Sequence, residues 1–186
     1  MTLGIDRWAV RFLVLVCLGA GGTCARGDTP APATLDASVQ RQDEIAKRGA
    51  LVMPFSLAST LHVFTQTPDG GIQRVVVREA GDARQIELIR QHLRQMQARF
   101  ARGDFSGPER IHGHDMPGLA QLEAAKPGQL RIAYQEVAGG AQLDYVTGDA
   151  RLIGAVHAWF DAQVSDHGAD AMVGHSSLSH NPSAAR

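Results

Sequence analysis

The sequence has very little cysteine, and this absence restricts the chemistry open to it. Its two cysteines, Cys17 and Cys24, both fall within the first 25 of 186 residues. Residues 1–25 are typical of an export signal peptide: basic residues at the start, a short apolar run over 12–18 and small residues at 23–25 as the cleavage site. A mature chain cleaved there would contain no cysteine, which excludes disulfides, thiolate metal sites and a cysteine nucleophile.

Long apolar runs and an excess of one charge are also missing. The apolar run in the signal is shorter than the roughly 20 residues that a membrane-spanning helix needs, and no later segment comes close. The 18 lysines and arginines balance the 19 aspartates and glutamates, so the chain lacks the basic surface typical of nucleic-acid-binding proteins. We therefore expect an exported, most simply periplasmic, protein that has no membrane span after signal cleavage and binds no nucleic acid.

Three segments lie outside the domain that the sequence predicts. Residues 26–33 are rich in proline and alanine and are predicted to form a flexible linker. Residues 34–49 carry a thin apolar stripe that ends at a glycine, which predicts an N-terminal helix. Residues 169–186 are predicted to form a disordered tail. This leaves 50–168 as the folded domain.

The domain contains an internal repeat. Gly81-Asp82-Ala83-Arg84 and Gly148-Asp149-Ala150-Arg151 each begin an amphipathic segment, and each follows two strand-like stretches joined around a Gly-Gly pair. Both aspartates suit the N-cap of a helix. The predicted elements are strands 60–66 and 72–78 with a helix from Asp82 to about Gly103 in the first unit, and strands 130–137 and 141–146 with a helix over 149–164 in the second.

Two such ββα units predict an α+β fold, with a four-stranded antiparallel sheet, two main helices on one face of it, and the N-terminal helix in addition. When Gly70 of the first Gly-Gly pair is matched with Gly139 of the second, His62 and Phe64 are placed on the open face of the sheet. That face is either wet, covered by the N-terminal helix, or used to form a homodimer. We favour the covered arrangement.

The insert between the two units, 103–129, has no counterpart elsewhere in the chain and holds His112-Gly113-His114-Asp115-Met116. Imidazoles and thioethers suit copper, whereas imidazoles with a carboxylate suit zinc or nickel. The competing interpretation is a surface loop in which the segment 116–119 closes the end of the core. The predicted metal ligands are His112, His114 and Met116, with His167, Met172 and His175 of the chain's last part as accessory donors.

Signals for catalysis are few. The Gly-Gly pairs lie in hairpins and are not followed by the lysine and hydroxyl residues of a phosphate-binding loop. None of the serines has the sequence context of a nucleophile elbow. An acid–base pair of His112 with Asp115 is the one catalytic arrangement that the insert suggests. His92 and His157 are expected to be boundary residues at the edges of their helices.

Several segments together resemble a known family. They are Val52-Met53-Pro54-Phe55, Gly103-Asp104-Phe105-Ser106, Ile111-His112-Gly113 with 116–119, and Trp159-Phe160-Asp161-Ala162-Gln163 with Ser165-Asp166-His167-Gly168. This combination resembles a family of small exported proteobacterial proteins that often carries the label aspartate carbamoyltransferase, and it extends from about Arg48 to Asp170. The resemblance implies export and the fold, and it implies no site residues. The Ser-x-Arg-Thr motif of true aspartate carbamoyltransferases is absent, because Leu61 follows Ser59-Thr60.

The leading functional hypothesis is therefore a non-enzymatic periplasmic protein that binds a transition metal such as copper, in metal binding or homeostasis. One alternative is an enzyme, either a hydrolase that uses the insert or the transferase of the family label. Another is a structural or interaction module that uses the open sheet face around His62 and Phe64.

Overall fold

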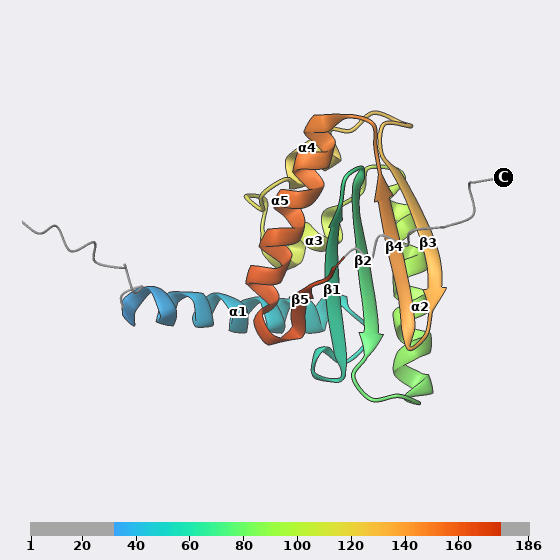
Figure 1. Cartoon of the computed structure of the whole chain (residues 1–186). Coiled ribbons are helices and arrows are strands. Elements are labelled where there is room, and N and C mark those ends of the chain that lie inside the picture. Colours follow the sequence, from blue (N-terminus) through green and yellow to red (C-terminus); the bar gives the residue numbers. More distant parts are fainter. Residues whose placement is uncertain (1–31, 176–186) are drawn as a thin grey trace, which may run out of the picture. The chain divides into compact units, whose positions relative to one another are not determined.

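The computed structural model describes residues 32–175, which form an α+β fold with one mixed five-stranded sheet (Figure 1). The strand order is β3-β4-β2-β1-β5. The predicted signal peptide, nearly all of the linker and residues 176–186 lie outside the described residues. The elements are α1 (Pro32–Val52), η1 (Leu57–Ser59), β1 (Thr60–Thr67), β2 (Gly70–Val77), α2 (Ala83–Phe100), α3 (Ser106–His112), α4 (Leu119–Glu123), β3 (Arg131–Val137), β4 (Gly140–Val146), α5 (Ala150–His167), η2 (Gly168–Asp170) and β5 (Ala171–Val173).

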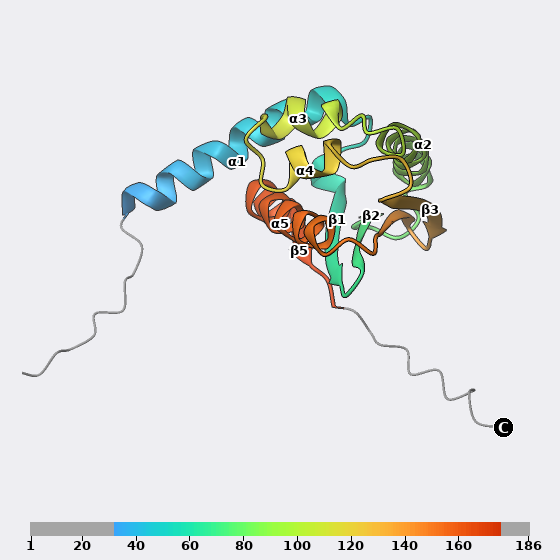
Figure 2. The same cartoon turned by 90° about the horizontal axis from the view of Figure 1, so that it is seen from above.

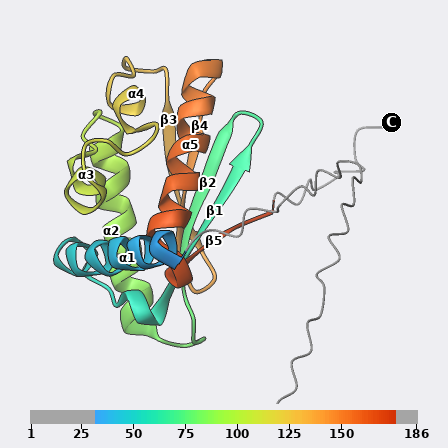
Figure 3. The same cartoon turned by 90° about the vertical axis from the view of Figure 1, so that its left-hand side faces the viewer.

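The order hairpin–helix occurs twice, and the helix of each unit, α2 and α5, begins as the sequence predicts. The Asp82 side chain accepts a hydrogen bond from the backbone N–H of Gln85, and the Asp149 side chain accepts one from Arg151. α2 and α5 lie on the same face of the sheet (Figures 2 and 3). α2 packs mainly on the hairpin β3–β4, whereas α5 packs on the hairpin β1–β2. Each unit therefore supplies the helix that covers the hairpin of the other.

The prediction of a four-stranded, purely antiparallel sheet is wrong by one strand. β5 pairs with β1 in parallel, with His62 opposite Ala171 and Phe64 opposite Val173. These strand residues come from the segment that we assigned to a disordered tail. Three residues are too few to show a period of two, so the sequence gives no sign of this strand. The duplication is thus approximate, because α3 and α4 separate the two units and β5 is added at the end.

The hairpins β1–β2 and β3–β4 correspond to each other, but the alignment between them differs by one residue from the predicted one. Gly70 and Gly140, not Gly139, are the first residues of β2 and β4. A Cβ atom on Gly70 would lie 2.1 Å from the carbonyl oxygen of Tyr145, and one on Gly140 would lie 2.1 Å from that of Val75. Both glycines therefore occupy the same place, where two strands approach too closely for a side chain.

This one-residue difference reverses the face to which β1 side chains point. His62 and Phe64 are only 4% and 2% exposed, and Phe64 packs against Phe160 of α5 with ring centroids 5.1 Å apart. The prediction that His62 and Phe64 lie on the open face is wrong. They face the helices.

α1 does not cover the open face of the sheet either. It packs against α3 and α5, with Ile45 buried at the contact. The guanidinium of Arg48 donates a 3.2 Å hydrogen bond to the carbonyl oxygen of Ile111 at the end of α3. α1 therefore helps to hold the insert in place. Within residues 32–175, none of the helices combines the length and the apolar character that crossing a membrane requires.

The insert contributes to the core. Phe105 stacks on Phe100 with ring centroids 4.3 Å apart and meets Trp159 of α5 edge-on. Met116 and Leu119 are also buried. The insert thus forms two short helices, α3 and α4, over the end of the apolar core.

We expect Gly140→Ala to lower the free energy of unfolding by about 1–3 kcal/mol, because the added methyl group would overlap the Val75 carbonyl and push β2 away from β4. Urea denaturation followed by circular dichroism measures the effect. Gly148→Ala is the control, since no atom lies within 4 Å of its Cβ position, and a change below about 0.5 kcal/mol is expected. If Gly140→Ala were as stable as the wild type, the close approach of the two strands would be refuted.

Candidate functional site

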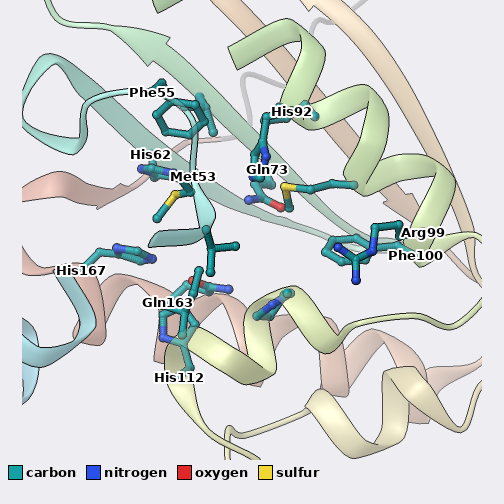
Figure 4. Close-up of a pocket in the computed structure, with 17 residues that line it drawn as sticks. Met53, Phe55, His62, Gln73, His92, Arg99, Phe100, His112, Gln163 and His167 are labelled. Atoms are coloured by element: carbon teal, nitrogen blue, oxygen red, sulfur yellow. The ribbon is translucent and has the colours of Figure 1, made fainter. Parts of the chain in front are cut away.

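Four histidines that are far apart in the sequence line one pocket of about 60 Å³ (Figure 4). His62 comes from β1, His92 from α2, His112 from α3 and His167 from α5. We call this space the histidine pocket. Its other lining residues are mostly apolar, with two amides and one arginine: Val52, Met53, Phe55, Gln73, Val75, Leu93, Met96, Arg99, Phe100, Gly107, Pro108, Ile111 and Gln163.

Two of these histidines are the last residues of helices and are followed by glycine. Gly113, after His112, has φ 94°, and Gly168, after His167, has φ 52°. Glycine adopts this left-handed backbone without the steric cost that a Cβ atom brings, so it ends a helix sharply. Each imidazole therefore stays with its helix at the pocket while the chain beyond it turns away.

His112 is held by a buried carboxylate from α5. Its Nδ1 lies 2.8 Å from Oδ2 of Asp166, and Arg41 of α1 donates to the same carboxylate from Nη2 at 2.7 Å and from Nε at 2.5 Å. Burial by itself raises the pKa of Asp166, but the hydrogen bonds of His112 and Arg41 outweigh this and lower that pKa to about 2. Asp166 is therefore charged and can only accept hydrogen bonds.

The consequence for His112 is a defined tautomer. Because Nδ1 must donate to the Asp166 carboxylate, a neutral imidazole carries its hydrogen on Nδ1 and presents a lone pair at Nε2. Nε2 is then the nitrogen that can accept a hydrogen bond, or a proton, from a ligand. Arg41 in turn fixes the carboxylate by a two-point contact.

His62 and His167 form a parallel stack beside His112. Their ring centroids are 5.1 Å apart at an interplanar angle of 6°, and His167 meets His112 edge-on at 5.0 Å. Burial lowers the pKa of His62 to about 4, and burial together with the two neighbouring imidazoles lowers the pKa of His167 to about 3. Both rings are therefore neutral at pH 7.

His92 forms another wall of the pocket. It meets the ring of Phe55 edge-on, with centroids 5.5 Å apart. Burial, assisted by the charge of Arg99, lowers the pKa of His92 to about 4, so this ring too is neutral at pH 7. Gln73 accepts a 2.8 Å hydrogen bond from the hydroxyl of Tyr145 at its Oε1, which leaves its Nε2 as the group it can offer to a ligand.

One histidine that lines the pocket has a buried nitrogen without a hydrogen-bond partner among the described residues. Among the described residues, three buried side-chain polar atoms lack a hydrogen bond: Nδ1 of His62, the hydroxyl of Tyr134 and Nε1 of Trp159. His62 is the member of this set that lines the pocket. Leaving such a nitrogen buried and unpaired costs about 1–3 kcal/mol. Fold stability does not account for its presence, which makes it a candidate for contact with a ligand.

The structure brings together two of the six predicted metal ligands. His112 and His167 meet in the histidine pocket. His114 points to solvent, with 85% of its side chain exposed, and pairs with Glu109. The remaining predicted ligands are also apart from the pocket: Met116 is buried in the core, Met172 lies exposed on β5, and His175 is exposed beyond β5.

No three histidine, cysteine, aspartate or glutamate side chains within residues 32–175 form a group that could hold a metal ion. Copper binding therefore stays a prediction. The predicted acid–base pair of His112 with Asp115 is not formed. Asp115 is exposed, and the carboxylate that contacts His112 belongs to Asp166.

Sequence reasoning missed His62, His92, Asp166 and Arg41 as site residues. A match of Gly70 with Gly140 would have turned His62 inward, but the two Gly-Gly pairs allow this alignment and the predicted one equally. His157 is a boundary residue, as expected: its Nε2 lies 3.0 Å from the carbonyl oxygen of Thr67 and 2.9 Å from that of Gly70, at the β1–β2 turn. Comparison with protein-family models, with curated proteins and with solved structures finds no match to the chain.

Proposed function

We propose that the protein binds a small organic ligand that places an uncharged polar group in the histidine pocket. The observation that carries this proposal is the unpaired Nδ1 of buried His62 in the pocket wall. A ligand that hydrogen-bonds to this nitrogen would remove the cost of leaving it unpaired. A mostly apolar pocket with a few convergent polar groups is also the usual form of a small-molecule site.

The size of the pocket limits what can enter it. A cavity needs about 10–15 Å³ to hold one water molecule, so a space of about 60 Å³ admits a group of a few heavy atoms. This is far below the roughly 300–1,000 Å³ of sites that enclose a whole drug-sized ligand. We therefore infer that only the tip of the ligand enters, such as an amide or a hydroxyl group.

Three of the segments that resemble the family contribute residues to the same pocket. Met53 and Phe55 come from the first of them, His112 from the third, and Gln163 and His167 from the last, and all five line the pocket. Segments separated by more than one hundred residues thus share one location, which favours a common role for them in ligand binding.

We expect His62→Phe to weaken ligand binding at least about tenfold, or 1.4 kcal/mol, because it removes Nδ1 and keeps an aromatic ring of similar size. The measurement is protein-observed NMR of the mature chain with a library of small amides, alcohols and heterocycles, in which a ligand of the pocket shifts the imidazole signals of His62 and His167. His114→Gln, a change at an exposed imidazole, is the control and should leave affinity unchanged. Equal binding by wild type and His62→Phe, or no shift at the pocket with any compound, would contradict the proposal.

An acid–base enzyme is the second candidate. It is favoured by the 2.8 Å contact between His112 and Asp166, because a histidine oriented at Nδ1 by a carboxylate is the usual form of a general base. The same NMR samples distinguish the two functions. A bound compound that is converted with time by the wild type, and not by His112→Gln, would assign an enzyme.

A transition metal is the alternative occupant of the pocket. Neutral imidazoles are common metal ligands, and three imidazole rings lie next to one another in the pocket: His62 stacks on His167, and His112 meets His167 edge-on. Since the described residues present no metal-binding group, these rings would have to rearrange around a metal ion. Calorimetric titration of the mature protein with Cu(II) and Zn(II), repeated with His112→Gln, separates this occupant from an organic ligand.

A further inference from the structure

A second, wider groove of about 500 Å³ lies next to the histidine pocket. The two spaces share Val52, His92, Met96 and Arg99 among their lining residues. A ligand whose tip occupies the pocket can therefore extend into this groove. Its lining residues are Arg48, Leu51, Val52, His92, Gln95, Met96, Arg99 and Arg110, and we call it the arginine groove.

The arginine groove is lined by three basic side chains. Its three guanidinium groups come from α1, α2 and α3, and none of its eight lining residues is acidic. His92 adds no charge at pH 7, because burial and Arg99 lower its pKa to about 4. Nothing in the wall itself neutralises the three arginines.

Two of the arginines have structural partners outside the wall. Arg48 pairs with Glu44 at 2.8 Å, and Arg99 pairs with Asp104 at 2.8 Å and donates to the hydroxyl of Ser106 at 2.7 Å. These contacts hold both guanidinium groups in place. Arg110, which is exposed, has no ion pair or hydrogen bond from its side chain in the part of the chain that the structure describes. Its guanidinium group is therefore available to bind an anion.

We propose that the arginine groove binds the anionic group of the ligand, a carboxylate or a phosphate. Guanidinium groups match the geometry of both anions through paired N–H donors. This inference rests on the proposed function and makes it more specific: the ligand is a small organic anion that carries an uncharged polar tip, with the tip in the histidine pocket and the anion at Arg110 and Arg99.

The test compares succinamic acid, which has an amide at one end and a carboxylate at the other, with the neutral succinamide, and adds inorganic phosphate as a bare anion. Protein-observed NMR of the mature chain follows the imidazoles of the pocket and the side-chain N–H signals of the arginines. We expect succinamate to bind at least about tenfold more tightly than succinamide, and this advantage to fall as salt screens the charges.

Arg110→Gln should remove most of that advantage and weaken phosphate binding, and Arg131→Gln, at an exposed arginine of β3, should do neither. If both compounds shift the pocket imidazoles equally, or if Arg110→Gln changes nothing, the anion site is overturned while the proposed function stands. If phosphate binds in an Arg110-dependent way and no amide reaches the pocket, the anion site stands and the proposed function fails. A lack of any response to succinamate and phosphate would overturn the inference.

Discussion

A fall in pH from 6.5 to 4 is expected to lower the free energy of unfolding by several kcal/mol. In the folded state the pKa values of His62 and His92 are about 4 and that of His167 is about 3, against 6.5 for an unperturbed histidine. Between the folded pKa values and 6.5, the unfolded chain binds more protons than the folded chain. The free energy of unfolding therefore rises with pH in this range and falls as the pH is lowered toward the folded pKa values. Each such histidine contributes about 1.4 kcal/mol per pH unit.

Urea denaturation at a series of pH values from 7 downward measures this dependence. His62→Phe should reduce the slope below pH 6.5 by close to one proton, about 1.4 kcal/mol per pH unit, because it removes one neutral buried imidazole. His114→Phe, at an exposed site, should leave the slope as it is. An unchanged slope in His62→Phe, or an NMR titration that places the pKa of His62 near 6.5, would refute the buried neutral state.

Asp166→Asn is expected to lower the free energy of unfolding at pH 7 by about 2 kcal/mol. The pKa of Asp166 falls from 3.8 to about 2 in the folded state, and each unit of such a shift corresponds to about 1.4 kcal/mol in favour of the charged form. Because the folded pKa is depressed, this contribution is complete above pH 3.8 and is lost as the pH falls toward 2. The loss caused by the variant should therefore persist at pH 5, which lies above the range in which Asp166 takes up a proton.

Urea denaturation at both pH values checks this result. Asparagine keeps the shape of the side chain, so the difference reports the charge that Arg41 and His112 stabilise. Asp115→Asn removes an exposed carboxylate three residues from His112 and should change stability by less than about 0.5 kcal/mol. If Asp166→Asn matched the wild type, the contact between α1, α3 and α5 would contribute nothing to stability.

Much of the fold follows from local sequence. The α+β class, both hairpins and the aspartate caps of α2 and α5 are visible as periodicity and as turn and cap residues. The sequence does not show which side chains of β1 point toward the helices, because the Gly-Gly pairs allow two alignments that differ by one residue. The correct one depends on which glycine meets a neighbouring backbone, Gly70 at Tyr145 and Gly140 at Val75. That contact joins separate strands and leaves no local pattern.

The site was predictable only in part. Two predicted ligands, His112 of the insert and His167 at the end of α5, are brought together by the structure. Their expected partner His114 points elsewhere, because Gly113 turns the chain outward where α3 ends. The actual partners, Asp166 and Arg41, are 54 and 71 residues from His112. Spacing along the chain carries no information about contacts of that length.

The exchange of covering helices between the two hairpins has a consequence for how the site forms. A hairpin left with only its own unit would keep an apolar face in water, so neither half can act as a separate folding unit. The histidine pocket takes His62 and His92 from the first half, and His112 and His167 from the insert and the second half. Binding competence should therefore appear and disappear in the same cooperative step as the whole domain, with no half-assembled site that could bind weakly on its own.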